Sequence, residues 1–448
     1  MPDMTAATSP LLTDLYELNM VQAYLDQGEA REAVFEFFVR RLPPRRGFLL
    51  AAGLETALSF LKHARFTKEE INWLAGTGRF KKNLLDFLAD FQFTGDVHAM
   101  PEGTVFFPHE PILRITAPLP QAQLVESRLI NILHFQCLIA SKAARMVLAA
   151  DGRSLSDFGL RSAHGAEAGM LASRAAYIGG FNGAANVLAG QEFGIPIVGT
   201  MAHSFVQVHG DEMKAFEAFA RSRPDNVVLL IDTYDTEAGA RKVVELAPKL
   251  NKDGIALRGV RIDSGDLVAM SKKVRGILDA GGLKDVVILV SGGIDEDVIR
   301  KFIAAGAPID GYGIGANLTT SQDAPTLDCA YKLQEYGGAP RRKLSEGKQT
   351  WPGRKQVWRS YDKNDRMNGD TLSVETDELT GDPLIAQVMK AGHRIGATPR
   401  LDEIRANARR NLAQLPEPLR RLEAAEYPVT VAEPLKILAQ QADKAARG

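Results

Sequence analysis

The sequence has little cysteine, no excess of charge of either sign and no long apolar run. Only Cys137 and Cys329 occur among 448 residues, which excludes a fold built on disulfide bonds and favours a reducing compartment. Lys and Arg total 54 and Asp and Glu total 55, so the formal net charge is −1. This balance argues against a general nucleic-acid or membrane-surface binder, although it leaves room for a local basic pocket.

Neither a membrane span nor a targeting segment is expected. No stretch approaches the ~20 apolar residues that a membrane-spanning helix needs. The amino terminus, MPDMTAATSPLLTDLYEL, has no basic region followed by an apolar one, so it does not resemble a signal peptide. The chain is 45% hydrophobic and 24% charged, as in soluble globular enzymes. We therefore expect a cytoplasmic protein that binds neither membrane nor nucleic acid.

The chain is longer than one hydrophobic core supports, since single cores stop growing near ~250–300 residues. Residues 1–150 mix helical and strand signals and end in a long apolar stretch, Leu124–Ala150, which predicts a core helix. We expect them to form an N-terminal α+β domain. An α/β barrel domain is predicted for residues 151–340. Residues 341–448, with a predicted hairpin around Gly381 and Asp382, form a C-terminal segment expected to pack back on the N-terminal domain.

The middle of the chain has the rhythm of alternating strands and helices. Seven short runs recur, several with helical stretches between them: SLSDF, YIGGF, IPIVG, VVLLID, GVRID, VVILVSGG and IDGYGIG. The later runs follow at roughly the ~30-residue pace of a βα unit, and their Val, Ile and Leu content suits parallel strands buried on both faces. We predict an α/β fold with an irregular, TIM-like (β/α) barrel of about seven strands. A doubly wound sheet also places ligands at the carboxyl ends of its strands. This pattern therefore does not decide whether the sheet is open or closes into a barrel.

Glycine-bearing turns follow three of the predicted strands. They are Ser291-Gly292-Gly293, Gly313-Ile314-Gly315 and Ser264-Gly265-Asp266. Glycine lets the backbone approach a ligand, and its N–H groups can hold phosphate oxygens. A single such turn would indicate only a tight βα connection. Several such turns at the carboxyl ends of the predicted strands, here called the rim, predict a phosphate site that includes Gly292, Gly293, Gly313 and Gly315.

Acidic residues also collect at this rim. Asp263 and Asp266 follow one strand, and Asp232 and Asp235 follow another. One or two carboxylates with water and substrate phosphates are the usual environment of Mg²⁺. Asp235 and Asp266 equally suit the caps of the helices that follow. Both interpretations stay open, and Asp263 with Asp266 is the candidate metal pair.

Four basic or titratable side chains complete the candidate site. Arg261 lies inside a strand run, where a charge needs a partner or an anionic ligand. Arg161 and His164 precede an Ala-rich helix, whose amino terminus favours an anion. His203 directly follows IPIVG, which suggests a general acid/base or a covalent nucleophile. The sequence has no HExxH, CxxC, P-loop or GxSxG pattern.

Taken together, these segments resemble the nicotinate phosphoribosyltransferase family. The matching stretches, in the family's order, are TDLYELNM (Thr13–Met20), FEFFVRRLP (Phe35–Pro43), DFGLRSAHG (Asp157–Gly165), GGFNGAANVLAG, GTMAHSF, GVRIDSGDL, SGGIDE and GIGANLTTSQDAPTLDCAYKL. The resemblance extends from about Thr13 to Trp358, with a weaker tail. Any one motif alone is weak, but their combination is specific.

The resemblance implies an activity and a set of contacts. The family joins nicotinate to 5-phosphoribosyl 1-diphosphate in NAD biosynthesis and couples this to ATP hydrolysis through a phosphohistidine. In this chemistry Mg²⁺ would help the diphosphate to leave. His203 matches that histidine, and we expect Asp263 to act with it. The resemblance also implies a head-to-tail homodimer in which one chain brings Tyr16 to the barrel mouth of the other. The matching nicotinate contacts are Tyr16, Thr200 and Arg261; the expected phosphoribosyl diphosphate contacts are Thr320, matched by the family, and Arg161, Gly292, Gly293, Gly313 and Gly315, placed by the sequence.

Four alternatives are weighed against this function. Nicotinamide phosphoribosyltransferase shares the barrel and the histidine, but Arg261 with Thr200 suits a substrate acid better than an amide. Quinolinate phosphoribosyltransferase would need a denser basic cluster and a shorter chain. A non-catalytic scaffold on a decayed barrel is disfavoured by the retained His203 and Asp263. A Schiff-base aldolase would need a lysine at a strand end, and the five clearest runs have none.

Overall fold

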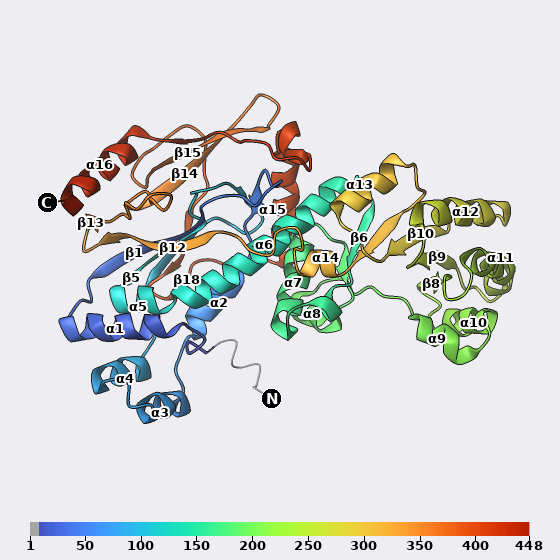
Figure 1. The fold of residues 1–448 in the computed structure, drawn as a ribbon, viewed down its shortest axis with the longest axis horizontal. Coiled ribbons are helices and arrows are strands. Elements are labelled where there is room, and N and C mark those ends of the chain that lie inside the picture. Colours follow the sequence, from blue (N-terminus) through green and yellow to red (C-terminus); the bar gives the residue numbers. More distant parts are fainter. Residues whose placement is uncertain (1–8, 448) are drawn as a thin grey trace. The chain divides into compact units, whose positions relative to one another are not determined.

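The structure is a computed structural model that describes residues 9–447 (Figure 1). The chain divides into two compact units. The first combines the chain up to Ser141 with the chain from Ala324 onward, and the second is Lys142–Asp323. The second unit is therefore an insertion in the sequence of the first.

The first unit is built on a seven-stranded sheet to which both ends of the chain contribute. Its order is β13-β12-β1-β5-β3-β17-β18. β1 pairs antiparallel with β5 on one side and with β12 on the other. The strands are β1 (Glu32–Val39), β3 (Asp96–Ala99), β5 (Leu113–Pro118), β12 (Cys329–Tyr336), β13 (Ala339–Pro340), β17 (Ala386–Lys390) and β18 (His393–Arg394).

Two smaller sheets, eight α-helices and the short 3-10 helix η3 (Glu417–Arg420) complete the described part of this unit. One sheet has the order β16-β14-β15-β19, and the other pairs β2 with β4. These strands are β2 (Leu49–Leu50), β4 (Val105–Phe106), β14 (Lys355–Tyr361), β15 (Met367–Val374), β16 (Asp382–Pro383) and β19 (Val429–Val431). The helices are α1 (Leu15–Gln27), α2 (Leu54–His63), α3 (Lys68–Gly76), α4 (Lys82–Ala89), α5 (Leu119–Leu124), α6 (Glu126–Ala150), which continues past Ser141, α15 (Leu401–Gln414) and α16 (Glu433–Arg447).

Helix α6 is the core helix that its composition predicts. Among the residues that the structure describes it is the one helix long and apolar enough to cross a membrane. However, 78% of its most apolar window is buried inside the protein. Burial against other protein elements accounts for its composition.

The predicted hairpin around Gly381 and Asp382 is wrong. β15 pairs with β14 and β19, whereas β17 pairs with β3 in the large sheet. Both strands alternate as a hairpin would, but alternation specifies a buried face and not a partner. Met389 of β17 is buried in the core under the large sheet, and this burial decides where the strand lies.

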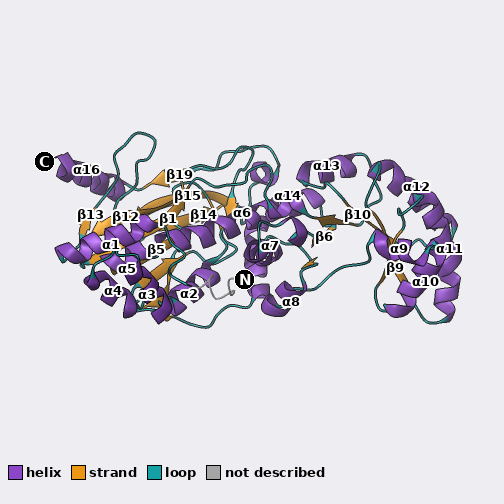
Figure 2. Cartoon of the chain, turned by 60° about the horizontal axis from the view of Figure 1, so that its bottom comes forward, coloured by secondary structure: helices purple, strands orange, loops and turns teal. Residues whose placement is uncertain are grey.

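The second unit contains a six-stranded parallel sheet, of order β7-β6-β11-β10-β9-β8. Its strands are β6 (Ser154–Asp157), β7 (Gly183–Ala184), β8 (Val227–Leu230), β9 (Leu257–Ile262), β10 (Val287–Ser291) and β11 (Gly311–Ile314). Its helices are η2 (Leu160–Ser162), α7 (Ala166–Ile178), α8 (Val187–Phe193), α9 (His203–His209), α10 (Glu212–Ser222), α11 (Thr236–Lys252), α12 (Leu267–Ala280), α13 (Glu296–Ala304) and α14 (Ala316–Thr319). Helices α10 to α12 lie beside β8 to β10 (Figure 2).

The parallel α/β core is confirmed, but the closed barrel of about seven strands is not. Five of the seven predicted runs form strands. The run YIGGF starts in the last two residues of α7, which ends at Ile178 and is capped by Gly179. IPIVG contributes only one bridge, from Ile197 to Ala184. Pro196 has no N–H to donate to a ladder, which shortens pairing in this segment. Within the described residues the sheet ends at β7 and β8 and is open.

Aspartates at the ends of loops start the helices of this unit. Asp235 accepts the N–H of Ala238 at the start of α11. Asp266 accepts the N–H groups of Val268 and Ala269 at the start of α12. Such caps satisfy backbone donors that the first helical turn leaves free. Of the two interpretations of Asp235 and Asp266, the capping one is therefore observed.

Candidate active site

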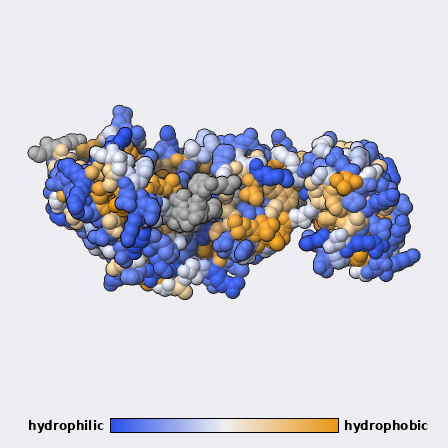
Figure 3. Space-filling model, turned by 90° about the horizontal axis from the view of Figure 1, so that it is seen from below, coloured by the Kyte–Doolittle hydropathy of each residue, from blue (hydrophilic) through white to orange (hydrophobic). Residues whose placement is uncertain are grey.

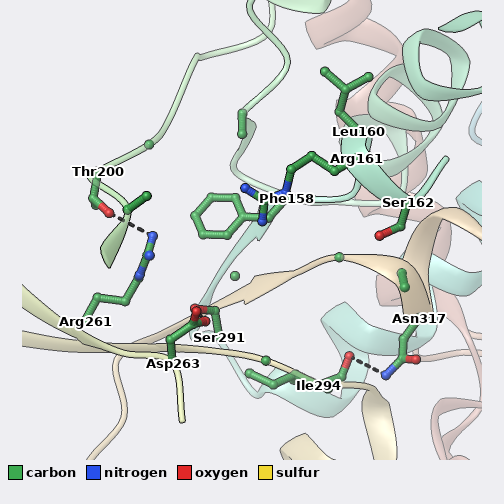
Figure 4. A pocket seen from close by; sticks show the side chains of 18 of the residues that line it. Phe158, Leu160, Arg161, Ser162, Thr200, Arg261, Asp263, Ser291, Ile294 and Asn317 are labelled. Carbon is green, nitrogen blue, oxygen red and sulfur yellow. Dashed lines mark hydrogen bonds between the residues drawn. The ribbon is translucent and has the colours of Figure 1, made fainter. Parts of the chain in front are cut away.

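A cavity of about 590 Å³ opens at the carboxyl ends of the strands of the second unit (Figure 4). Its walls come from the loops after β6, β9, β10 and β11 and from the segment before α9. The lining residues are Phe158, Leu160, Arg161, Ser162, Ala185, Gly199, Thr200, Met201, Ala202, Arg261, Asp263, Ser291, Gly292, Gly293, Ile294, Gly313, Gly315, Ala316 and Asn317. Eight predicted site residues therefore share one cavity, as expected for carboxyl-end loops of parallel strands.

Arg261 provides the positive charge of one wall. It extends from β9, and its Nη1 donates to Thr200 Oγ1 at 2.8 Å while Nη2 donates to the Met201 carbonyl at 3.1 Å. Its Nε is buried and has no hydrogen-bond partner within the described part of the chain. Burial lowers the pKa of the guanidinium, and Arg161 adds to this, while Asp263 and Asp232 oppose it. An arginine stays protonated at neutral pH despite such a shift, so the cavity has a cation held in one orientation.

Asp263 provides a negative charge close to Arg261, directly after the end of β9. Its Oδ1 accepts the hydroxyl of Ser291, and its backbone N–H donates to Asp232 Oδ2 at 2.8 Å. Asp232 Oδ2 also accepts the Ser264 hydroxyl at 2.7 Å. Asp232 thus holds the Asp263–Ser264 turn in shape from outside the cavity.

His203 is the first residue of α9 and lies beside Asp263. Its Nε2 is 3.8 Å from Asp263 Oδ2, and its Nδ1 is 3.1 Å from the hydroxyl oxygen of Thr233. About 38% of the side chain is exposed, so a reactant in solution can reach the imidazole. The ring is therefore oriented from one side by Thr233 and faces a carboxylate on the other, which suits proton or phosphoryl transfer.

The turn after β10, with Gly292 and Gly293, lines the cavity. Gly292 has φ +98°, and a side chain there would come within 2.7 Å of the Asp263 carbonyl oxygen. Gly293 also has a left-handed φ, +64°. Asn317 donates to the carbonyl of Ile294 at 3.0 Å and holds the end of the turn (Figure 4). The result is a rigid turn that only glycine permits and that suits an anion.

Buried charges fix the helix that follows this turn. Glu296, in the first turn of α13, is 3% exposed and lies 2.6 Å from Lys142 Nζ and 3.1 Å from Arg145 Nε. Both cations belong to α6. Because a buried carboxylate needs its partners, this contact sets where α13 and the turn before it begin.

Arg161 and Phe158 come from the loop after β6. Asp157 holds this loop: it accepts the N–H of Gly159 at 2.7 Å and the hydroxyl of Ser173 at 2.7 Å. Burial raises the pKa of Asp157 above its ordinary value. Phe158 is the one aromatic side chain among the described residues that line the cavity, and the Arg261 guanidinium carbon is 5.9 Å from its ring centroid.

Four predicted site residues lie elsewhere. Of the described residues that line the cavity, none is His203, Thr320, Asp266 or Tyr16. His203 adjoins the cavity through Asp263, whose Oδ2 is 3.8 Å from His203 Nε2. Thr320 caps α14, where its hydroxyl donates to the Ala316 carbonyl at 2.8 Å. Asp266 caps α12. Tyr16 belongs to α1 of the first unit, where it is 47% exposed, and burial together with Glu17 raises its pKa.

The acidic residues of the site bear on whether it can hold a magnesium ion. Within the described residues, no three His, Cys, Asp or Glu side chains cluster as a protein cage for a metal. Mg²⁺ does not need one, because it is commonly held by one or two carboxylates, water and substrate phosphates. Asp263 supplies a carboxylate at the cavity wall. The residues therefore fit a metal that arrives with a phosphorylated substrate, through Asp263 more than through the capping Asp266.

Sequence reasoning missed several residues of the site. Phe158 directly follows a strand, as the other rim residues do. However, an aromatic residue at such a position is normally predicted to lie in the hydrophobic core. Ser291 ends its own strand, and its sequence context indicates only a turn. Asn317 and Thr233 act through hydrogen bonds to other residues, for which the sequence carries no signal.

Comparison with known proteins agrees with the site. Models of the nicotinate phosphoribosyltransferase N-terminal domain, family and C-terminal domain match residues 11–134, 153–337 and 376–439. The chain is 48% identical over 426 residues to nicotinate phosphoribosyltransferase pncB2 of Mycobacterium tuberculosis, covering 94% of this chain and 91% of that protein. It is 36% identical to the nicotinate phosphoribosyltransferase of Bacillus subtilis, covering 94% and 93%.

A solved structure supports the same assignment. The crystal structure of human nicotinic acid phosphoribosyltransferase matches with a TM-score of 0.85 at 29% identity, over 96% of this chain and 99% of that one. The shared fold, the matches along almost the whole chain and the cavity at the strand ends all agree. The chain belongs to the nicotinate phosphoribosyltransferase family.

Proposed function

We propose that the protein joins nicotinate to 5-phosphoribosyl 1-diphosphate, forming nicotinate mononucleotide and diphosphate for NAD biosynthesis, with ATP hydrolysis coupled through His203. The observation that carries the proposal is the arrangement of the cavity. An oriented guanidinium, an aromatic ring, a second arginine and glycine turns line one cavity. The guanidinium and the ring suit a pyridine carboxylate, and the second arginine and the glycine turns suit phosphates.

Nicotinate binding is assigned to Arg261, Thr200 and Phe158. The planar fork of Arg261 can pair with both oxygens of a carboxylate. Thr200 holds that fork by accepting from Nη1 at 2.8 Å. Phe158 offers a flat apolar face within reach of the same guanidinium, so a pyridine ring can stack on it while its carboxylate meets Arg261. Tyr16 would add a second face from another copy of the chain.

The phosphoribosyl diphosphate end is assigned to Arg161 and the glycine turns. Gly292 and Gly293 supply N–H groups, and α13, which begins just after them, adds the partial positive charge of a helix amino terminus. Gly313, Gly315 and Thr320 are the further proposed contacts. When bound, Mg²⁺ held by Asp263 and Asp266 would offset the charge of the departing diphosphate. The chain's own task is to hold the nucleophilic pyridine nitrogen opposite that leaving group.

ATP coupling is assigned to the imidazole of His203. In the proposed step a ring nitrogen attacks the γ-phosphorus of ATP, an N–P bond forms, and the bond to the ADP oxygen breaks. Water later breaks the N–P bond and releases phosphate. Thr233 engages Nδ1, which leaves Nε2 as the attacking nitrogen. Phosphorylation would place negative charge beside Asp263, and we propose that this favours a closed, product-forming state.

One assay tests the reaction and another tests the histidine. The protein with nicotinate, phosphoribosyl diphosphate, Mg²⁺ and ATP should release diphosphate, and nicotinamide should replace nicotinate poorly. A preference for nicotinamide would contradict the acid-specific function. Acid-labile phosphate should label the wild type but not His203→Ala, and labelling that survives the substitution would contradict the covalent role.

A homodimer is proposed from apolar surface on both units. Leu160, Val187, Leu188 and Ile197 are 44–68% exposed in the second unit, and Figure 3 shows an apolar patch over α8. In the first unit, exposed apolar side chains gather at the start of α1, where Tyr16 lies. Clustered exposed apolar residues mark interfaces. Ile197→Asp should convert a dimer to a monomer in sedimentation analysis, and an unchanged mass would contradict this surface.

The cytoplasm is the proposed location. Cys137 and Cys329 are both free thiols in the structure. Unpaired cysteines are usual in reducing compartments.

A further inference from the structure

Gly313 faces the aromatic residue of the cavity at very short range. It belongs to β11, where it pairs with Ser156 of β6 and Ser291 of β10. A Cβ atom at this position would lie 2.5 Å from Phe158 Cδ2, closer still to Cε2, and 3.2 Å from Cζ. Real Cβ atoms essentially never approach another atom within 3.0 Å. One edge of the Phe158 ring therefore occupies the space that any side chain at residue 313 would need.

The backbone itself does not require glycine here. Gly313 is in a strand and does not have a left-handed φ, unlike Gly292 and Gly293. The ring, in turn, is held from its own backbone, because the Phe158 N–H donates to the Ile314 carbonyl at 2.7 Å. Glycine is therefore required at residue 313 because the Phe158 ring needs the space, and not because of the backbone conformation.

We infer that Gly313 is a positioning residue for the pyridine substrate, because its missing side chain leaves room for the Phe158 ring to lie beside Arg261. This inference rests on the proposed function for the identity of the substrate. It gives Gly313 a role different from that of a phosphoribosyl diphosphate contact.

The geometry predicts where an added methyl group would drive the ring. With a Cβ at residue 313, Phe158 must move by roughly 1 Å or more to restore ordinary contact at about 3.5 Å. Phe158 and Gly313 both line the cavity, so the space next to the ring is cavity space. The displaced ring would enter the space for the pyridine and lose its place next to the guanidinium. Nicotinate binding should therefore suffer, and phosphoribosyl diphosphate binding should not.

A stability measurement tests the steric claim without any substrate. Gly313→Ala should lower the midpoint of thermal unfolding by about 3–10 °C, as overpacking does in a domain of this size. In a Phe158→Ala background the same change should cost almost nothing, because the ring is gone. Gly276→Ala, at an open helical position in α12, is the matched control and should not lower the midpoint. A full loss in the Phe158→Ala background would overturn the inference.

Kinetics then test the functional claim. Gly313→Ala should raise KM for nicotinate on the order of 2- to 10-fold, the worth of an aromatic stack, with KM for phosphoribosyl diphosphate unchanged. Phe158→Ala/Gly313→Ala should be no worse than Phe158→Ala alone. A rise confined to phosphoribosyl diphosphate, or additive effects, would overturn the inference. If the wild type lacks the activity, the proposed function fails instead, and the unfolding data still decide whether Gly313 makes room for the ring. If Gly313→Ala does not fold, recovery of folding in the double variant supports the inference and its absence overturns it.

Discussion

Replacing Arg261 by lysine separates charge from shape at the carboxylate end of the cavity. Lysine keeps the positive charge but loses the planar fork that donates to Thr200 at 2.8 Å and to the Met201 carbonyl at 3.1 Å. Without these two contacts the cation is no longer held in one orientation. The change should weaken recognition of a substrate carboxylate while leaving the electrostatic potential of the cavity similar.

The expected size of the effect follows from the hydrogen bond that is lost. A hydrogen bond to a charged group contributes about 1.5–3 kcal/mol, and a neutral one about 0.5–1.5 kcal/mol. At about 1.4 kcal/mol per factor of ten, Arg261→Lys should lower kcat/KM for nicotinate by roughly 10- to 150-fold. For nicotinamide, which has a neutral amide, the loss should be only about 2- to 12-fold. The preference for the acid should therefore shrink by roughly tenfold.

The assay is diphosphate release at saturating phosphoribosyl diphosphate, with nicotinate and nicotinamide varied separately. Arg258→Lys is the matched control, because Arg258 is an exposed arginine on the same strand, β9. It should leave both values unchanged. If Arg261→Lys lowers kcat/KM equally for the two substrates, Arg261 does not read the carboxylate and the reasoning is refuted.

Three further predictions concern Glu17, Asp263 and Gly292. Burial raises the pKa of Glu17 from 4.5 to about 7, so its stabilising contribution is present below pH 4.5 and lost as pH rises through about 7. Between these pH values the free energy of unfolding should fall by at most about 1.4 kcal/mol per pH unit. Urea unfolding should show a smaller fall for Glu17→Gln, and an unchanged fall would contradict the role of Glu17. Asp263→Asn should lower kcat by about 100-fold or more in steady-state assays, and near-normal turnover would remove Asp263 from the mechanism. Gly292→Ala should cost about 1–3 kcal/mol of stability by thermal unfolding, because φ is +98° and the Asp263 carbonyl is close. Equal stability would contradict the strained turn.

The sequence predicted much of the site because its signals are local. A glycine pair directly after an apolar run, or an arginine inside one, indicates a rim position without knowledge of any other segment. Gly292, Gly293 and Arg261 are such cases, and all three line the cavity. The signal for Phe158 is ambiguous, since an aromatic residue beside a strand is more often core.

The failures concern properties that depend on distant residues. IPIVG has the composition of a strand. However, Pro196 cannot donate a backbone hydrogen bond, and the segment forms only one isolated β-bridge, between Ile197 and Ala184. Alternation in β15 and β17 indicated strands correctly, but the choice of partner depends on β3 and β14. Closure of a barrel is likewise decided by the edges of the whole sheet, which no single run encodes.

The interrupted order of the first unit has a consequence for synthesis. Strand β1 leaves the ribosome early, but one of its two neighbours, β12, follows only after residues 40–328. During that time β1 has an open edge next to apolar side chains, and such edges invite aggregation. The inserted second unit is contiguous in the chain and can form its parallel sheet first. We therefore expect nascent chains that end before β12 to depend on chaperones, and full-length chains to fold slowly, as proteins with many distant contacts do.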